Sequence, residues 1–429
     1  MELKYHKYTL PNGIRVFMVP KHETRAIYFE AMFKVGSRYE NDELRGISHF
    51  LEHMAYKGTK KRPTAMDISK EVDQHGGFTN AYTGLDITAY WVKLPSEKLE
   101  LAIDIISDIL INSKLDEKVL NKEKGVILEE IKMHNDNPDF FAAIKFHELI
   151  FGDTPLGKDI AGAEEDVKSM NREKMLEYKN KFYKTNNMII AIGGNFSVEK
   201  TKKLLKRYFG KIKGKIEDNY KENHIIQECP IAKIYTRKDT QQAKLLLGFR
   251  SFGRNGSEKD RYARGLLARA LGYYMSSILF VEIREKRGLS YDIGCDVSSF
   301  DETGDFEIGG GFAVNKIPEV LKVVCSILKD IKKKGLEAKE LKMAKSHQIG
   351  QINLNIENVS SWASGFATNE LYGLPIETPD EIIKKTKKVT NTDIKRLARE
   401  IFRPENFNMV IVGPIDSKEE KKYLDLIKL

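Results

Sequence analysis

A repeated segment near the end of each half of the chain limits the folds it can adopt. Residues 182–193 read Phe-Tyr-Lys-Thr-Asn-Asn-Met-Ile-Ile-Ala-Ile-Gly, and residues 402–413 read Phe-Arg-Pro-Glu-Asn-Phe-Asn-Met-Val-Ile-Val-Gly, an offset of 220 at both ends (402 − 182 and 413 − 193). A weaker match relates Gly77-Phe-Thr-Asn-Ala-Tyr to Gly288-Leu-Ser-Tyr-Asp-Ile, at an offset of 211 (288 − 77). The chain therefore contains two copies of one unit of about 200 residues.

Each copy is expected to be an α+β unit of the sandwich type, a mainly antiparallel sheet packed with helices. We place a first domain at 1–212, a polar linker at 213–228 and a second domain at 229–429. Gly309-Gly310-Gly311 follows a strand-like segment and is interpreted as a bulged strand. In the first half, alternating and 3.6-residue patterns predict a hairpin at 4–20, strands at 26–35, 78–84, 86–94 and 188–192, and helices at 63–76, 98–111, 116–133, 142–151, 172–183 and 198–209.

Composition excludes several classes of function. The formal net charge is +9, from 71 basic and 62 acidic residues, but both signs are mixed along the chain and no basic patch is interleaved with aromatic residues. Nucleic-acid binding is therefore disfavoured. Three widely spaced cysteines, Cys229, Cys295 and Cys325, indicate neither a disulfide framework nor a cysteine zinc site. No apolar run is long enough to cross a membrane, and the first residues lack a signal-peptide pattern, so we expect a cytoplasmic location.

The chemistry is concentrated in Gly-Ile-Ser-His-Phe-Leu-Glu-His-Met, residues 46–54. In a helix, His49 and His53 lie one turn apart on one face and can bind one divalent ion, for which zinc is the usual choice. Glu52 is close enough to take a proton from water without binding the metal. This order, His-x-x-Glu-His, is the zinc-protease motif in reverse. From these residues alone, two ordinary surface histidines remain an equally good interpretation.

A third ligand is expected from the helix at 117–133, since a catalytic zinc site needs three protein ligands. Glu123 and Glu130 are seven residues apart and share a helix face that is close to the apolar stripe, whereas Glu129 points about 100° away. Carboxylates beside a packed interior need a compensating charge, which a metal would supply. A solvated acidic face is the alternative, and it explains Glu129 better than the other two.

The motif beginning at His49, with a glutamate 77 positions after the second histidine (130 − 53) and another seven before that, resembles the pitrilysin family of zinc peptidases. The sequence His-Phe-Leu-Glu-His-Met-Ala-Tyr-Lys-Gly-Thr is especially similar to the mitochondrial processing-peptidase branch. The resemblance implies that His49, His53 and Glu130 bind one zinc ion per chain. It also implies that Glu52 is the general base on zinc-bound water and that Glu123 orients a ligand.

The same resemblance implies further substrate contacts. Asn80 and Ala81 match the family's edge strand, whose backbone pairs with the peptide. Arg284 and Tyr291, seven residues apart, match an Arg/Tyr pair that contacts the substrate and stabilises the oxyanion. Arg287 is a neighbouring candidate for the arginine.

The family's chamber has two half-shells, each of two such units, and this chain supplies one half-shell. We therefore expect a homodimer in which Arg284 and Tyr291 of one chain serve the zinc of the other. The expected substrates are unfolded oligopeptides or presequence-like segments. The alternative is a non-catalytic scaffold subunit that pairs with another peptidase-like chain, because some family members have lost their zinc ligands.

Overall fold

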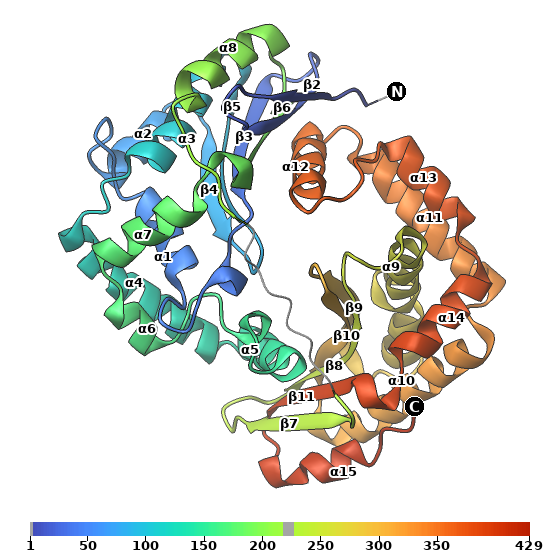
Figure 1. The fold of residues 1–429 in the computed structure, drawn as a ribbon. Coiled ribbons are helices and arrows are strands. Elements are labelled where there is room, and N and C mark those ends of the chain that lie inside the picture. The colour runs from blue at the N-terminus through green and yellow to red at the C-terminus, as the bar shows by residue number, and fades with distance from the viewer. Residues whose placement is uncertain (1–2, 218–226) are drawn as a thin grey trace. The chain divides into compact units, whose positions relative to one another are not determined.

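The structure, a computed structural model, describes residues 3–217 and 227–429. Within these residues the chain forms two units (Figure 1). The first comprises 3–132, 158–217 and 354–378, and the second comprises 133–157, 227–353 and 379–429. Each unit therefore includes a segment from the other half of the sequence. Of the predicted linker, residues 218–226 lie outside the described residues.

The first unit is built on a six-stranded sheet with the order β1-β2-β6-β3-β5-β4. Only β2 and β6 are parallel; the other neighbours are antiparallel. Its strands are β1 (His6–Thr9), β2 (Arg15–Pro20), β3 (Ala26–Phe33), β4 (Phe78–Thr83), β5 (Thr88–Pro95) and β6 (Met188–Gly194). The strand β4 lies at one edge, so one side of its backbone is free to bind another strand.

The second unit repeats this plan with the order β7-β11-β8-β10-β9. Here β7 and β11 are parallel and the remaining neighbours are antiparallel. This is the same arrangement as in the strands β2-β6-β3-β5-β4 of the first unit, taken in that order. Its strands are β7 (Ile231–Thr236), β8 (Ala243–Phe252), β9 (Ser290–Ser299), β10 (Thr303–Phe312) and β11 (Phe407–Gly413). The predicted duplication and α+β class are thus confirmed, and the repeated segments form the equivalent strands β6 and β11.

Helices bury their apolar stripes on these sheets. Several begin with capping boxes, such as the one between Thr64 and Asp67 at the start of α2. The first unit contains α1 (Ile47–Ala55), α2 (Ala65–Asp73), α3 (Leu99–Asn112), most of α4 (Glu117–Asp136), α6 (Glu164–Ser169), α7 (Arg172–Phe182), α8 (Val198–Phe209) and α12 (Val359–Leu371). The second contains α5 (Pro138–Phe151), α9 (Glu258–Gly272), a π-helix (Phe280–Glu285), α10 (Ile317–Lys334), most of α11 (Ala338–Asn355), α13 (Pro379–Lys388), α14 (Asn391–Ile401) and α15 (Glu420–Leu424).

Two helices are exchanged between the halves of the sequence. Helix α12, coloured orange in Figure 1, packs Phe366 against the apolar face of β2 and β6. Helix α5 packs on β8 and β11, where a Cβ added to Gly248 would lie 2.1 Å from the ring of Phe146. Each of the contiguous domain ranges 1–212 and 229–429 therefore contains one helix of the other unit and lacks one helix of its own.

Two sequence predictions for the local structure can be compared directly. The glycine run is a bulged strand as predicted, because the register of β10 against β9 shifts between Gly310 and Phe312. The helix predicted at 142–151 was wrong at its start: α5 begins at Pro138, and the side chain of Asn137 caps it. An Asn-Pro pair is a strong helix-start signal, and it outweighs the weak apolar pattern that follows.

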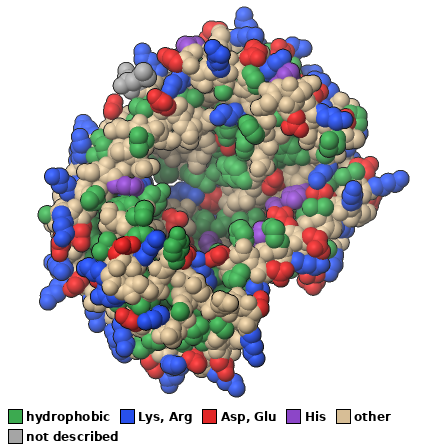
Figure 2. Space-filling view, turned by 180° about the vertical axis from the view of Figure 1, so that it is seen from behind, with side chains coloured by type: hydrophobic (Ala, Val, Ile, Leu, Met, Phe, Trp, Pro, Cys, Tyr) green, Lys and Arg blue, Asp and Glu red, His purple; other side chains and the backbone are tan. Residues whose placement is uncertain are grey.

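Charged side chains of both signs are interspersed on the face shown in Figure 2. This mixture agrees with the sequence, in which 71 basic residues accompany 62 acidic ones. Among the described residues, no helix is both long enough and apolar enough to cross a membrane.

Candidate metal centre

Helix α1 presents the His-x-x-Glu-His motif. Its apolar side chains, including Phe50 and Leu51, are buried in the core of the first unit. Its first residues are held by Glu40, whose carboxylate oxygens accept hydrogen bonds from Gly46 N (2.7 Å) and Ser48 N (2.8 Å). Gly46 has φ +81° and no side chain to cap the helix, so Glu40 supplies the missing acceptor.

The structure brings His49, His53 and Glu130 together. The Nε2 atoms of the two histidines are 3.2 Å apart, and Glu130 Oε2 lies 3.7 Å from His49 Nε2 and 3.5 Å from His53 Nε2. Within residues 3–217 and 227–429, this is the only group of three histidine, cysteine or carboxylate side chains whose donor atoms are close enough to share a metal ion.

These distances fit zinc. Tetrahedral ligands at about 2.1 Å from a central ion lie about 3.4 Å from one another, close to the three separations here. Two imidazole nitrogens and a carboxylate oxygen are also the donor types that zinc prefers. Around a tetrahedral ion the three donors would fill three positions and would leave the fourth for water or substrate.

Glu123 holds His53 from the other side. Glu123 Oε1 lies 2.9 Å from His53 Nδ1 and 2.8 Å from Lys57 Nζ, and the residue is only 4 % exposed. Burial alone would lower the pKa of His53, but hydrogen bonds to Glu123 and Glu130 raise it to about 9. The carboxylate therefore fixes the ring orientation and keeps Nε2 directed toward Glu130.

The exposure of the three glutamates on α4 follows the sequence prediction in part. The side chain of Glu123 is buried as expected, and that of Glu129 is 73 % exposed and paired with Lys132. Glu130 is intermediate, with 29 % of its side chain exposed.

Glu52 lies beside this group on α1. Its Oε2 accepts a hydrogen bond from Thr83 Oγ1 at 3.0 Å, which ties it to the edge strand β4. Burial raises the pKa of Glu52, while His53 and Thr83 offset part of that rise. A carboxyl group with a raised pKa is suited to accept and then return a proton near neutral pH.

The edge strand β4 is tied to the helix that carries the metal group, through Thr83 and Tyr56. Gly84 N donates to Ile87 O, so the backbone of Gly84 points toward β5. The direction alternates from residue to residue in an antiparallel pair, and the backbone of Ala81, three residues earlier, therefore points to the open edge. Ala81 N is bonded to the side chain of Asn80 (2.9 Å), and the hydroxyl of Tyr56 donates to Asn80 O at 2.9 Å.

The sequence patterns did not identify three residues that contact this site: Tyr56, Lys57 and Thr83. Tyr56 lies seven residues after His49 and Lys57 four after His53, so helical spacing alone would have placed them beside the histidines. Thr83 is adjacent only through the fold.

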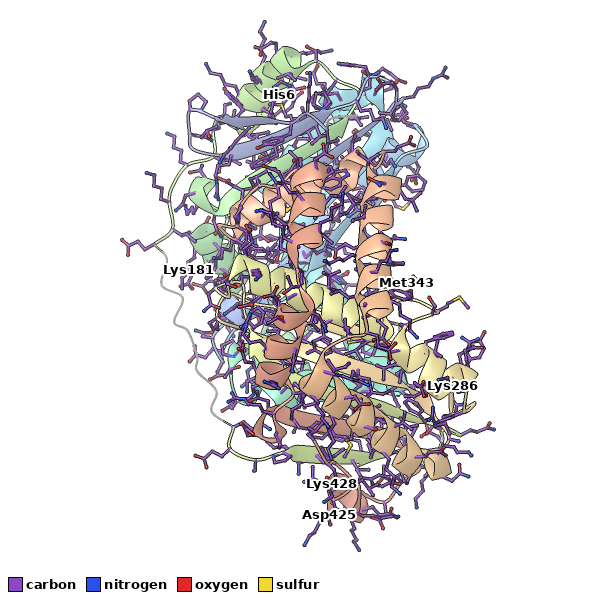
Figure 3. All side chains as sticks on the ribbon, turned by 90° about the vertical axis from the view of Figure 1, so that its right-hand side faces the viewer. His6, Lys181, Lys286, Met343, Asp425 and Lys428 are labelled. Atoms are coloured by element: carbon purple, nitrogen blue, oxygen red, sulfur yellow. The ribbon has the colours of Figure 1, made fainter. Side chains whose placement is uncertain are left out.

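The predicted Arg284 and Tyr291 belong to the second unit. The guanidinium of Arg284 stacks on the rings of Tyr291 (4.4 Å) and Phe280 (4.6 Å), and Tyr291 is 80 % exposed. Arg287 pairs with Glu282 at 2.6 Å, so Arg284 is the arginine associated with Tyr291. Lys286, labelled in Figure 3, is exposed and also pairs with Glu282.

Comparisons with known proteins identify relatives that are named zinc proteases. The sequence profile described as Insulinase (Peptidase family M16) matches residues 15–164, and that of the Peptidase M16 inactive domain matches residues 169–347. YmxG of Bacillus subtilis, named an uncharacterized zinc protease, is 33 % identical over 408 residues, which cover 95 % of this chain and 98 % of that protein. A protein of Rickettsia felis with the same description is 34 % identical over 407 residues, covering 95 % and 97 %.

Solved structures support the fold. A protease from Helicobacter pylori superposes with a TM-score of 0.88 at 24 % identity, covering 96 % of this chain and all of that one. A Peptidase M16 inactive domain from Pseudomonas fluorescens has the same TM-score at 18 % identity, covering 97 % and 99 %. From the two profile matches and relatives similar over nearly their whole length, we conclude that this chain belongs to the M16, or pitrilysin, family of peptidases.

Proposed function

We propose that the protein is a zinc-dependent endopeptidase of unfolded oligopeptides. The observation that carries this proposal is the triangle of donor atoms from His49, His53 and Glu130, with sides of 3.2 to 3.7 Å, beside the half-buried Glu52. Bound zinc would supply a Lewis acid that lowers the pKa of water and polarises a carbonyl group. The M16 family also contains inactive members, so the complete set of ligands is the distinguishing feature.

The chain's own residues would carry the proton transfers. Glu52 would remove a proton from the attacking water and return it to the leaving amine, while Glu123 keeps His53 oriented. The free edge of β4 would bind the peptide as an added strand, and the Asn80 side chain would leave Ala81 N when the peptide binds. Only an extended segment can pair in this way, which favours unfolded substrates.

The experiment is a comparison of wild-type protein, Glu52→Gln and the matched control Glu129→Gln, which alters an exposed glutamate on α4. Peptide cleavage and bound zinc are measured on each. Glu52→Gln should retain about one zinc per chain and lose turnover, whereas Glu129→Gln should keep both. Wild-type turnover by Glu52→Gln would refute the assigned base. A wild-type protein without zinc or cleavage would favour a scaffold role.

We also propose that the active form is a homodimer in which Arg284 and Tyr291 act on the zinc site of the partner chain. The proposal is supported by the family resemblance and by the location of these two residues in the second unit, outside the zinc-binding unit.

Complementation tests this arrangement. Inactive Glu52→Gln and weakened Tyr291→Phe chains, once mixed and allowed to exchange, should recover about a quarter of wild-type activity. This value follows because half of the dimers are mixed and each has one intact site. Activity no higher than that of the separate variants would show that each site is complete within one chain.

A further inference from the structure

The carboxylate of Glu52, the proposed general base, is held by one hydrogen bond. Within the part of the chain that the structure describes, its only hydrogen-bond donor is Thr83, whose Oγ1 lies 3.0 Å from Glu52 Oε2. The other oxygen, Oε1, receives no hydrogen bond from these residues. The two oxygens therefore differ, because the protein fixes Oε2 and leaves Oε1 for water or substrate.

The strand β4 directs the hydroxyl of Thr83 toward α1. Side chains alternate along β4, and Thr79, Ala81 and Thr83 occupy its half-buried face. The Thr79 hydroxyl lies 3.1 Å from the hydroxyl of Tyr56, one helical turn after Glu52, so two hydroxyl contacts join the strand to this helix. Threonine is branched at Cβ and has few favourable χ1 angles, which limits the directions its hydroxyl can take.

The turn that follows Thr83 is anchored in the first unit. Gly84 O accepts a hydrogen bond from Ser37 N at 3.2 Å. In the same turn, Asp86 pairs with Arg38 at 2.8 Å, and the two side chains are only 4 % and 0 % exposed. Breaking a buried ion pair is costly, because it leaves an uncompensated charge. The end of β4 therefore holds Thr83 in a fixed place beside the base.

A purely structural contact between α1 and β4 is the alternative interpretation of this hydrogen bond. The contact between Thr79 and Tyr56 already joins the same two elements. The bond from Thr83 differs because its acceptor is the carboxylate of the proposed base, and a hydrogen bond to an ionised group is the stronger kind. Its loss should therefore affect the orientation of that carboxylate more than the packing of the helix.

We propose that Thr83 is a positioning residue, whose hydroxyl holds Oε2 of Glu52 so that Oε1 is the oxygen that accepts the proton of the attacking water. The inference rests on the proposed peptidase function. The water oxygen bonds to the carbonyl carbon as its proton moves to Oε1. The C–N bond then breaks, and Oε1 gives the proton to the leaving nitrogen, while Thr83 keeps its own proton. Orientation of this kind raises kcat with little effect on substrate affinity.

Steady-state kinetics on Thr83→Val and Thr83→Ser test this role. Valine has nearly the shape of threonine without the hydroxyl, so kcat should fall at least about tenfold while KM changes by less than about twofold. Serine keeps the donor and should bring kcat back to within about threefold of wild type. The matched control is Thr9→Val, which removes an exposed hydroxyl from β1 and should behave as wild type. If Thr83→Val unfolds early, Thr83→Ala removes the same hydroxyl and should give the same fall in kcat.

Two further measurements do not depend on turnover. Each variant should bind about one zinc ion per chain, as measured by elemental analysis, because the hydroxyl of Thr83 bonds to the base and not to a ligand. In the inactive Glu52→Gln protein, adding Thr83→Val should change the affinity for a fluorescent peptide by less than about twofold, as measured by anisotropy. Weaker peptide binding would mean that Thr83 acts through the strand β4 and not through Glu52.

Wild-type kcat in Thr83→Val would overturn the proposal. So would a serine variant as slow as the valine variant, or a loss that appears in KM, zinc content or peptide affinity. Failure of the peptidase function itself is distinguishable, because wild-type protein with zinc would then cleave no peptide. In contrast, the proposal for Thr83 alone fails if the wild-type protein cleaves and the Thr83 variants show the wrong pattern.

Discussion

Replacing Glu123 by Gln tests whether this carboxylate tunes the metal centre through His53. Glu123 Oε1 is 2.9 Å from His53 Nδ1, and the substitution keeps the shape of the side chain while removing its charge. The substitution has two effects of opposite sign on the apparent affinity for zinc. A partner that orients a ligating histidine contributes about 10- to 100-fold to metal affinity, and this contribution is weakened.

The second effect concerns competition between zinc and a proton. Burial lowers the pKa of His53, but its hydrogen bonds to Glu123 and Glu130 raise it to about 9. A histidine must lose its proton to bind zinc. Because pH 7 is two units below the pKa of His53, the apparent affinity of the wild-type protein for zinc at pH 7 is about 100-fold lower than it would be with His53 fully deprotonated. Without the charge of Glu123 the pKa of His53 falls, and part of this competition disappears.

The expected result therefore depends on pH. At pH 9 Glu123→Gln should bind zinc about 10- to 100-fold more weakly than wild type, and at pH 7 the difference should be several-fold smaller. Wild-type affinity should rise about tenfold per pH unit between pH 7 and 9. Competition with a chromophoric chelator at pH 7, 8 and 9 measures both quantities, with Glu129→Gln as the control. The same affinity ratio at all three pH values would refute the reasoning.

Three further substitutions have definite expected outcomes. Gly46→Ala should lower the free energy of unfolding by at least about 1–3 kcal/mol, because φ is +81° and the new Cβ would lie 2.3 Å from Ala161 O. Denaturant titration measures this change, and unchanged stability would contradict it. Tyr56→Phe removes the 2.9 Å hydrogen bond to Asn80 O, so steady-state kinetics should show a higher KM with little loss of kcat, and the reverse pattern would argue against a role in binding. The pKa of Glu307, raised from its ordinary value near 4.5 to about 7, means that the folded state holds this proton more tightly. Stability should therefore fall, by at most about 3 kcal/mol, as pH rises from 4.5 past 7, and Glu307→Gln should flatten that fall in urea titrations at several pH values.

The sequence was sufficient for the fold class, and the resemblance to the pitrilysin family named the three side chains, His49, His53 and Glu130, that the structure brings together. Periodicity places His49 and His53 on one face of a helix, and the seven-residue spacing of Glu123 and Glu130 places both on one face of another. Matching segments in the two halves predicted the repeated sheet, because each copy must bury the same strand. These features depend on local periodicity or on direct similarity, both of which are visible in one sequence.

Contacts between distant segments were not predictable in the same way. The hydrogen bond from Thr83 to Glu52 joins an edge strand to a helix 31 residues away, and no spacing rule identifies it. The hydrogen bonds that Gly46 N and Ser48 N donate to the carboxylate of Glu40 depend on the conformation of the preceding loop. No pattern in the sequence indicates that conformation. The packing of α12 on β6 joins residues far apart in the chain, and its amphipathic pattern does not indicate which sheet it covers.

The exchange of α5 and α12 has a consequence for how this gene product can be divided. A fragment containing only the first half would leave the outer face of β6, with Ile189 and Ala191, uncovered and prone to aggregate. The second half alone would lose the ring of Phe146 from above Gly248. Neither half of the sequence therefore contains all of the segments that complete its own sheet, because each unit takes one helix from the other half.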